Sequence, residues 1–182
     1  MKFSTSQLLD ELKARTLIHI QHAERLLQEP EDKINSRISE NSWSVLECME
    51  HLNRYGKFYI PEISRRISSS KTSPASAFQS GILGNYFAQS MLPKEKLNKM
   101  KTLSNMNPIH SELNKTVVEE FIRQQNQILE LLEKSKNINL NKVKTSISIT
   151  RLIKLKLGDT FRFVINHNTR HMKQAERILE NI

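Results

Sequence analysis

Cysteine, glycine and proline are all scarce in this 182-residue chain, and each scarcity narrows the choice of fold. Cys48 is the only cysteine, so no internal disulfide can form, and a reducing compartment is favoured. Only 4 glycines and 5 prolines are present, and long stretches contain neither. A turn-rich β protein needs more of both residues, so the composition favours helices.

Long hydrophobic runs are missing as well. No apolar segment approaches the roughly 20 residues that a membrane-spanning helix needs. The N-terminal sequence MKFSTSQLLDELKAR becomes charged and amphipathic at once and lacks the apolar core of a signal peptide. We therefore expect one cytoplasmic domain over residues 1–182, with no membrane partner.

Acidic residues are absent from residues 134–156, which carry seven lysines and arginines in a chain of formal net charge +9. A second basic run, KEKLNKMK, covers residues 94–101. Such runs attract nucleic acid, anionic lipid or acidic small molecules, or simply form a solvated surface loop. No zinc-finger or RRM-type motif accompanies the charge, so nucleic-acid binding is not the favoured interpretation.

Four long segments have the 3.6-residue period of amphipathic helices, over residues 4–28, 44–69, 111–134 and 157–181. Pro61 should kink or divide the second helix near Lys57. The long connection over residues 71–111 is predicted to hold a short helix around residues 83–90, and TSISITRLI, within the basic segment, a short extended piece. The four apolar stripes can be buried only against one another. They predict an all-α four-helix bundle with a long crossover connection between its second and third helices.

Two histidines, His167 and His171, lie four residues apart in the last predicted helix and therefore share one face. Helical phase places His171 within the buried stripe and His167 at its edge. An unpaired buried polar group costs roughly 1–3 kcal/mol, so both rings need a metal ion or hydrogen bonds to neighbouring helices. A third ligand must come from another helix. His51 is the best candidate, although His19 on the apolar face of the first helix stays open, and His110 lies in a proline-flanked loop.

The stretch SWSVLECMEHL at 42–52, followed far downstream by LGDTFRFVINHNTRHMKQAERIL at 157–179, resembles the DinB/YfiT-like superfamily over nearly the whole chain. The resemblance implies a four-helix bundle in which His51, His167 and His171 bind one divalent metal ion, usually zinc or nickel, with water completing the coordination. Each ligand needs a partner for its other ring nitrogen, and Glu47 and Gln174 are nearby in helical phase. For Glu47 the alternative is a capping box that starts the second helix at Ser44.

The resemblance also implies a function. The family includes thiol-dependent S-transferases, a thiol-dependent isomerase and metal-dependent hydrolases. We therefore expect a metal-dependent S-transferase or hydrolase acting on a small molecule, and a basic rim suits an anionic low-molecular-weight thiol. The alternatives are a noncatalytic metal-binding bundle and a basic nucleic-acid-binding protein. No residue in the sequence identifies a nucleophile, a base or a substrate pocket.

A homodimer is a further expectation from the resemblance. Three apolar residues of the third predicted helix, Val118, Ile122 and Leu129, lie off its inward stripe. Together they would form an apolar patch against a partner.

Overall fold

The computed structural model describes residues 1–93 and 102–182, and the basic run at 94–101 lies outside these ranges. Its four long helices are α1 (Thr5–Gln28), α3 (Val45–Ser68), α5 (Thr116–Lys134) and α6 (Leu157–Leu179). Each overlaps one of the four segments predicted from the hydrophobic period. The predicted all-α fold is confirmed.

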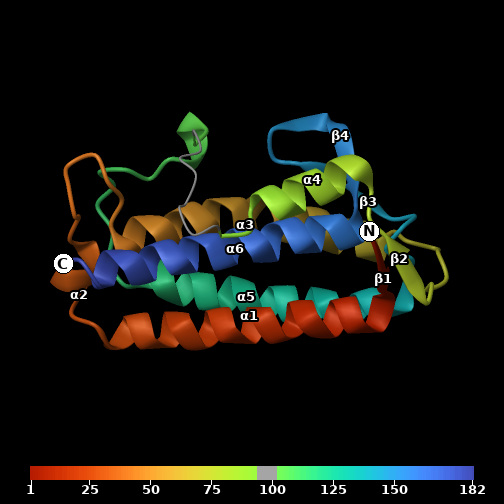
Figure 1. Cartoon of the computed structure of the whole chain (residues 1–182), viewed down its shortest axis with the longest axis horizontal. Helices are drawn as coiled ribbons and strands as arrows, with labels where there is room; N and C mark the ends of the chain where they lie inside the picture. The colour runs from red at the N-terminus through yellow and green to blue at the C-terminus, as the bar shows by residue number, and fades with distance from the viewer. Residues whose placement is uncertain (94–101) are drawn as a thin grey trace.

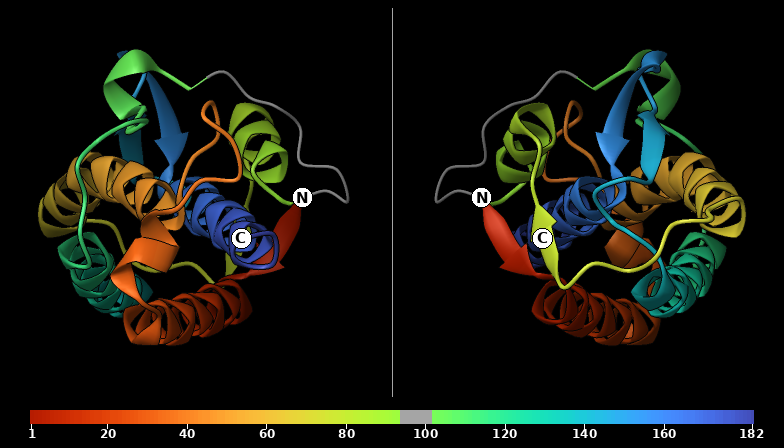
Figure 2. Two further views of the ribbon diagram at one scale, coloured as in Figure 1. Left: turned by 90° about the vertical axis from the view of Figure 1, so that its left-hand side faces the viewer. Right: turned by 90° about the vertical axis from the view of Figure 1, so that its right-hand side faces the viewer.

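The four long helices pack around a common core. Helices α1 and α3 each pack against both α5 and α6, and Figure 2 shows the four helices nearly end-on. Figure 1 shows that α3 and α5 run in the same direction, so the chain returns along the bundle between them. Among the described residues, no helix is both long and apolar enough to cross a bilayer.

Shorter elements lie between the long helices. They are α2 (Glu31–Asn35), α4 (Ile82–Ser90) and the 3₁₀ turns η1 (Ser104–Met106) and η2 (Ser135–Asn137). Two antiparallel pairs of strands join β1 (Lys2–Ser4) to β2 (Ala77–Gln79), and β3 (Lys144–Ile147) to β4 (Thr150–Lys156). Helix α4 matches the short helix predicted in the connection. TSISITRLI is extended as predicted, but it forms most of a hairpin, and the β1–β2 pair had no signal in the sequence.

Two predictions about helix continuity and helix faces need correction. Pro61 does not divide the second long helix, because α3 continues as one element across it and the residues on either side, Tyr59 and Ile63, are buried in the core. Val118 is fully buried rather than part of an outward patch. It packs with residues of α1, α3 and α6, so the patch predicted on α5 is reduced to Ile122 and Leu129.

The third long helix begins at Thr116 rather than at residue 111. The Asn114 side chain accepts a hydrogen bond from the Thr116 amide at 3.0 Å, and Glu31 of α2 accepts one from the Lys115 amide at 3.0 Å. These acceptors satisfy amides at the start of α5, so residues 111–115 remain outside the helix.

Asp159, in the first turn of α6, fastens the connection to the bundle. Its buried carboxylate accepts hydrogen bonds from the Ser80 hydroxyl and from the Gly81 amide, which is 2.8 Å away at the start of α4. Arg162 donates to Asp159 at 3.0 Å and to Asn85 of α4 at 3.1 Å. One carboxylate thus lies at the N-termini of two helices, where negative charge is favourable.

The β3–β4 hairpin is fastened to α3 by Glu62. The Glu62 Oε1 atom accepts hydrogen bonds from the Ser146 amide and from the Arg66 Nε atom, each at 2.9 Å. Tyr59, one turn earlier on α3, accepts a hydrogen bond from the Ser148 amide at 3.2 Å. The hairpin therefore has a defined position at one end of the bundle, visible beside α4 in Figure 1.

Candidate metal centre

Three histidines from two helices meet in the interior of the bundle. Ser44 and Glu47 form the predicted capping box, which starts α3 so that His51 lies two turns further on. His167 and His171 extend from α6 toward it. The Nε2 atom of His167 lies 3.2 Å from that of His51 and 3.1 Å from that of His171.

These separations match the spacing of ligands around one small cation. Two nitrogens bound tetrahedrally to zinc at about 2.0–2.1 Å lie about 3.3 Å apart. The ligand atoms of His51, His167 and His171 all lie within 4.8 Å of one another. Among residues 1–93 and 102–182, this is the one group of three or more histidine, cysteine or acidic residues with such spacing.

In two of the three rings, the Nδ1 atom lies within hydrogen-bond distance of an acceptor outside the cluster. The Nδ1 atom of His51 lies 2.7 Å from the carbonyl oxygen of Met106 in η1. The Nδ1 atom of His171 lies 2.9 Å from the Oε1 atom of Gln174. Both partners are acceptors, so each ring carries its proton on Nδ1 and directs an Nε2 lone pair inward.

The number of protons available on the three Nε2 atoms indicates whether the cluster suits a cation. A neutral His167 has at most one proton on Nε2, which can satisfy only one of its two neighbours. At least one of the two short N···N contacts then has no proton between its two nitrogens, and the lone pair on that neighbouring ring is left unsatisfied in a buried site. A divalent ion would accept all three lone pairs at once, so the donor set fits a metal of the kind that imidazole prefers.

Burial keeps the rings neutral. The pKa of His51 is lowered to about 4, because desolvation and, to a smaller extent, the nearby charge of Arg54 outweigh the opposing hydrogen bond to Met106. Desolvation also lowers the pKa values of His167 and His171 well below the ordinary range, and the neighbouring rings add to the effect. Neutral imidazole is the form that binds metal ions.

Aromatic side chains surround the three rings. The Trp43 ring centroid is 4.7 Å from that of His51, and the Tyr55 centroid is 4.6 Å from that of His167. Phe163 stacks on His167 with a centroid separation of 5.9 Å. All three aromatic residues are only partly buried. They give the histidine cluster an aromatic border that is itself partly exposed.

Glu47 is not a partner of the histidine cluster. Its fully buried carboxylate accepts two hydrogen bonds from Arg37 and one each from the Ser44 and His110 amides. Although burial raises its pKa, these donors outweigh that effect and hold the pKa below its ordinary value. The capping-box alternative for Glu47 is therefore correct. Of the two residues that helical phase suggested, only Gln174 bonds to a cluster ring.

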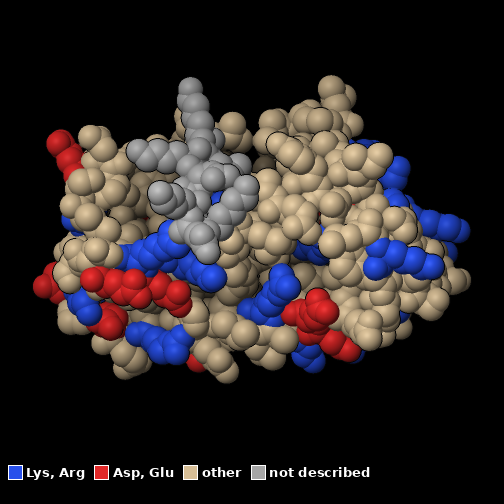
Figure 3. Space-filling view, viewed as in Figure 1, with Lys and Arg blue, Asp and Glu red and all other residues tan. Residues whose placement is uncertain are grey.

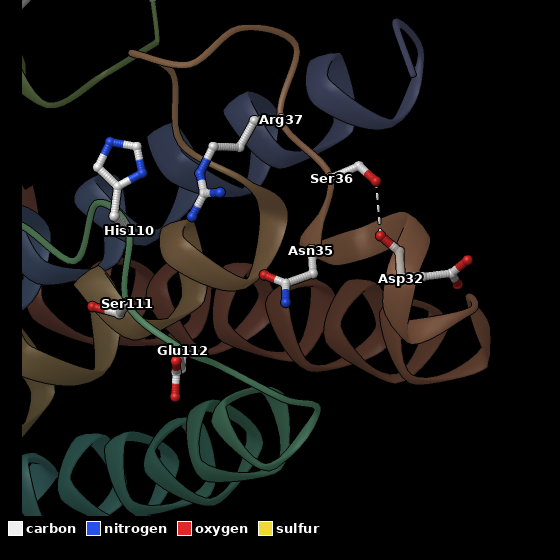
Figure 4. Close-up of a pocket in the computed structure, with 7 residues that line it drawn as sticks. All are labelled: Asp32, Asn35, Ser36, Arg37, His110, Ser111 and Glu112. Carbon is white, nitrogen blue, oxygen red and sulfur yellow. Dashed lines mark hydrogen bonds between the residues drawn. The ribbon is translucent and has the colours of Figure 1, made fainter.

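The structure separates the other two histidines considered above from this cluster. His19 bonds through Nε2 to Thr169 at 2.8 Å. His110 adopts a positive φ of 61° and lines a separate polar hollow of about 480 Å³ beside α2, shown in Figure 4. In that view its ring lies near the Arg37 side chain, at the loop that leads to α5.

Sequence reasoning missed Met106, Trp43 and Phe163. Met106 contributes a backbone carbonyl, which any residue could supply, so the identity of this residue in the sequence could not indicate the contact with His51. Trp43 and Phe163 do lie within the two quoted motifs, where aromatic residues next to metal-ligand positions were the available signal.

Comparison with known families matches residues 5–175 to the DinB superfamily. The match covers most of the chain and all three histidines of the cluster, so the chain belongs to this superfamily. Searches of curated proteins and of solved structures found no match.

Proposed function

We propose that this member of the DinB superfamily is a divalent-metal-dependent enzyme, a thiol-dependent S-transferase or a hydrolase. In this proposal His51, His167 and His171 hold one zinc or nickel ion. The observation that carries the proposal is that the Nε2 atoms of the three histidines lie close together. In His51 and His171 the other ring nitrogen, Nδ1, is hydrogen-bonded to an acceptor outside the cluster, so Nε2 is left to bind the ion.

A metal ion bound there would supply Lewis-acid chemistry, polarising a carbonyl group or favouring a thiolate over a thiol. The protein's own residues supply orientation and exclusion of water. Met106 and Gln174 hold the rings of His51 and His171 in one rotation, which keeps the inward lone pairs aimed at one point. Trp43, Tyr55 and Phe163 limit the approach of water and offer apolar contact to a small substrate.

The proposed substrate is an anionic low-molecular-weight thiol or an acidic ester. The support is electrostatic, because the chain has a formal net charge of +9 and residues 134–156 contain no carboxylate. A positive field raises the local concentration of an anionic substrate, and this effect weakens as salt rises. Turnover should therefore be faster at low ionic strength.

The first test is the metal content of purified protein, measured by elemental analysis. The wild-type chain should hold one divalent ion per chain, and His167→Ala should hold none while keeping its helical circular dichroism. His110→Ala is the matched control, because His110 lies at the separate hollow, and its metal content should equal that of the wild type. Full occupancy in His167→Ala would refute the ligand assignment.

The second test is turnover. Thiol conjugation and ester hydrolysis are measured over a panel of substrates with the metal-loaded wild type, His171→Ala and His110→Ala. The wild type and His110→Ala should turn over the same substrate, and His171→Ala should not. Equal rates in the wild type and His171→Ala would remove the metal from the mechanism. Absence of turnover in a fully loaded wild type would favour the noncatalytic bundle.

A further inference from the structure

Large apolar side chains are exposed together at one end of the molecule. Ile82 and Tyr86 are one turn apart on α4 and are 96% and 67% exposed. Ile149 and Leu152, at the tip of the β3–β4 hairpin, are 64% and 93% exposed. Helix α4 contacts β4, and Figures 1 and 2 place α4 and the hairpin on the same side of the bundle. These four residues are called the apolar ridge below.

Carboxylates are absent from the two chain segments that carry the ridge. Residues 63–93 and 134–158 contain no aspartate or glutamate. Of the acidic residues that border them, Glu62 and Asp159 are buried and bonded to arginines, and the exposed Glu133 is paired with Lys136. Figure 3 shows that the upper right of the molecule, over α4 and the hairpin, is uncharged with lysine and arginine at its edge.

Lysines accompany the ridge on the hairpin. Lys154 and Lys156 are two residues apart on β4 and share one face of the strand, and Leu152 lies just before them, in the irregular part of the strand between Thr150 and Lys154. Lys144 is paired directly with Lys156 across the two strands. Like charges opposite each other destabilise a sheet, and within residues 1–93 and 102–182 neither lysine has an acidic partner. The repulsion between Lys144 and Lys156 would be relieved if this surface bound a negatively charged partner.

We propose that the apolar ridge and its lysines dock on the surface of an anionic lipid bilayer. Aliphatic and tyrosine side chains flanked by lysines are the composition of segments that enter the headgroup region. A protein partner is disfavoured because the cores of protein interfaces are depleted in lysine. A second copy would bring the lysines of both chains together, and a nucleic acid would leave Ile82 and Leu152 without an apolar contact.

The test is co-sedimentation with vesicles of phosphatidylcholine alone or of equal parts phosphatidylcholine and phosphatidylglycerol. The wild type should bind the mixed vesicles at about 0.05 M salt, bind them more weakly at about 0.3 M, and leave the neutral vesicles unbound. Replacing Ile149 and Leu152 together with Ser should weaken binding roughly tenfold or more. Each lysine near an anionic surface contributes about a fivefold gain, so Lys144→Gln with Lys154→Gln should weaken binding roughly 25-fold.

Two control variants remove the same kinds of side chain elsewhere. Ile38, 50% exposed in the loop after α2, is replaced with Ser, and the exposed Lys13 of α1 with Gln. Both should bind mixed vesicles like the wild type. The proposal is overturned if the wild type does not bind mixed vesicles, or if the serine variant binds them equally well.

Two further outcomes would reassign the ridge. If sedimentation equilibrium shows self-association that the Ile149 and Leu152 substitutions abolish, and vesicles are not bound, the ridge serves a second copy. If duplex DNA is bound, and only the lysine substitutions weaken binding to DNA and vesicles, the surface is a nucleic-acid site. Either result overturns docking on lipid.

Discussion

The carboxylate of Glu62 should stabilise the protein through its bonds to the hairpin, and this can be measured as a function of pH. Burial raises the pKa of this carboxyl. The hydrogen bonds from the Ser146 amide, Arg65 and Arg66 outweigh burial and bring the pKa down from 4.5 to about 2. Such a shift corresponds to about 3 kcal/mol of folding free energy. Arg65 is 65% exposed, so solvent screens part of this interaction, and we expect Glu62→Gln to cost about 1–2 kcal/mol at pH 7.

The pH dependence has a definite sign. A carboxyl with a depressed folded pKa stabilises the protein fully above its unfolded pKa, here 4.5, and this stabilisation is lost as pH falls toward the folded value of about 2. The gap in unfolding free energy between the wild type and Glu62→Gln should therefore be constant from pH 7 to about pH 5 and shrink below it.

Urea unfolding followed by circular dichroism measures this gap. A chelator is kept in every sample, so that metal binding does not add its own pH dependence. The control is Glu11→Gln, at an exposed position of α1, which should change stability by less than about 0.5 kcal/mol. A gap that stays constant down to pH 3, or no gap at pH 7, would refute the role assigned to the charge of Glu62.

The remaining predictions concern the site, the connection and the assembly. Gln174→Ala frees the outer nitrogen of His171 and should weaken metal affinity roughly 10–100-fold in a competition titration with a chelator, and unchanged affinity would contradict the orienting role. Gly84→Ala would place a methyl group in overlap with the Asp159 side chain, so thermal unfolding should show a loss of about 1–3 kcal/mol. An unchanged melting temperature would argue against this tight contact. The expected homodimer should give twice the chain mass by light scattering at micromolar concentration, and a monomer would count against it.

Local pattern predicted the helices, and together with the family resemblance it predicted the three histidines that the structure brings together. The 3.6-residue period of apolar side chains located α1, α3, α5 and α6, because each stripe must be buried and only a helix places it on one face. Scarce glycine and proline excluded a turn-rich alternative. The motif around His51 and the four-residue spacing of His167 and His171 named the residues that the structure then brings together.

The tertiary structure alone decided how those residues are supported. Met106 holds His51 through a backbone carbonyl that is brought there by a connection of more than 40 residues, and no side-chain pattern records such a contact. Glu47 had two roles that were equally compatible with helical phase, and only the positions of Arg37 and the His110 amide distinguished them. The sequence also could not predict that Ile82 and Leu152 are exposed, because an apolar residue in a short helix or strand can lie in the core or on the surface. Contacts between distant segments settle such cases, since they set which groups lose water on folding.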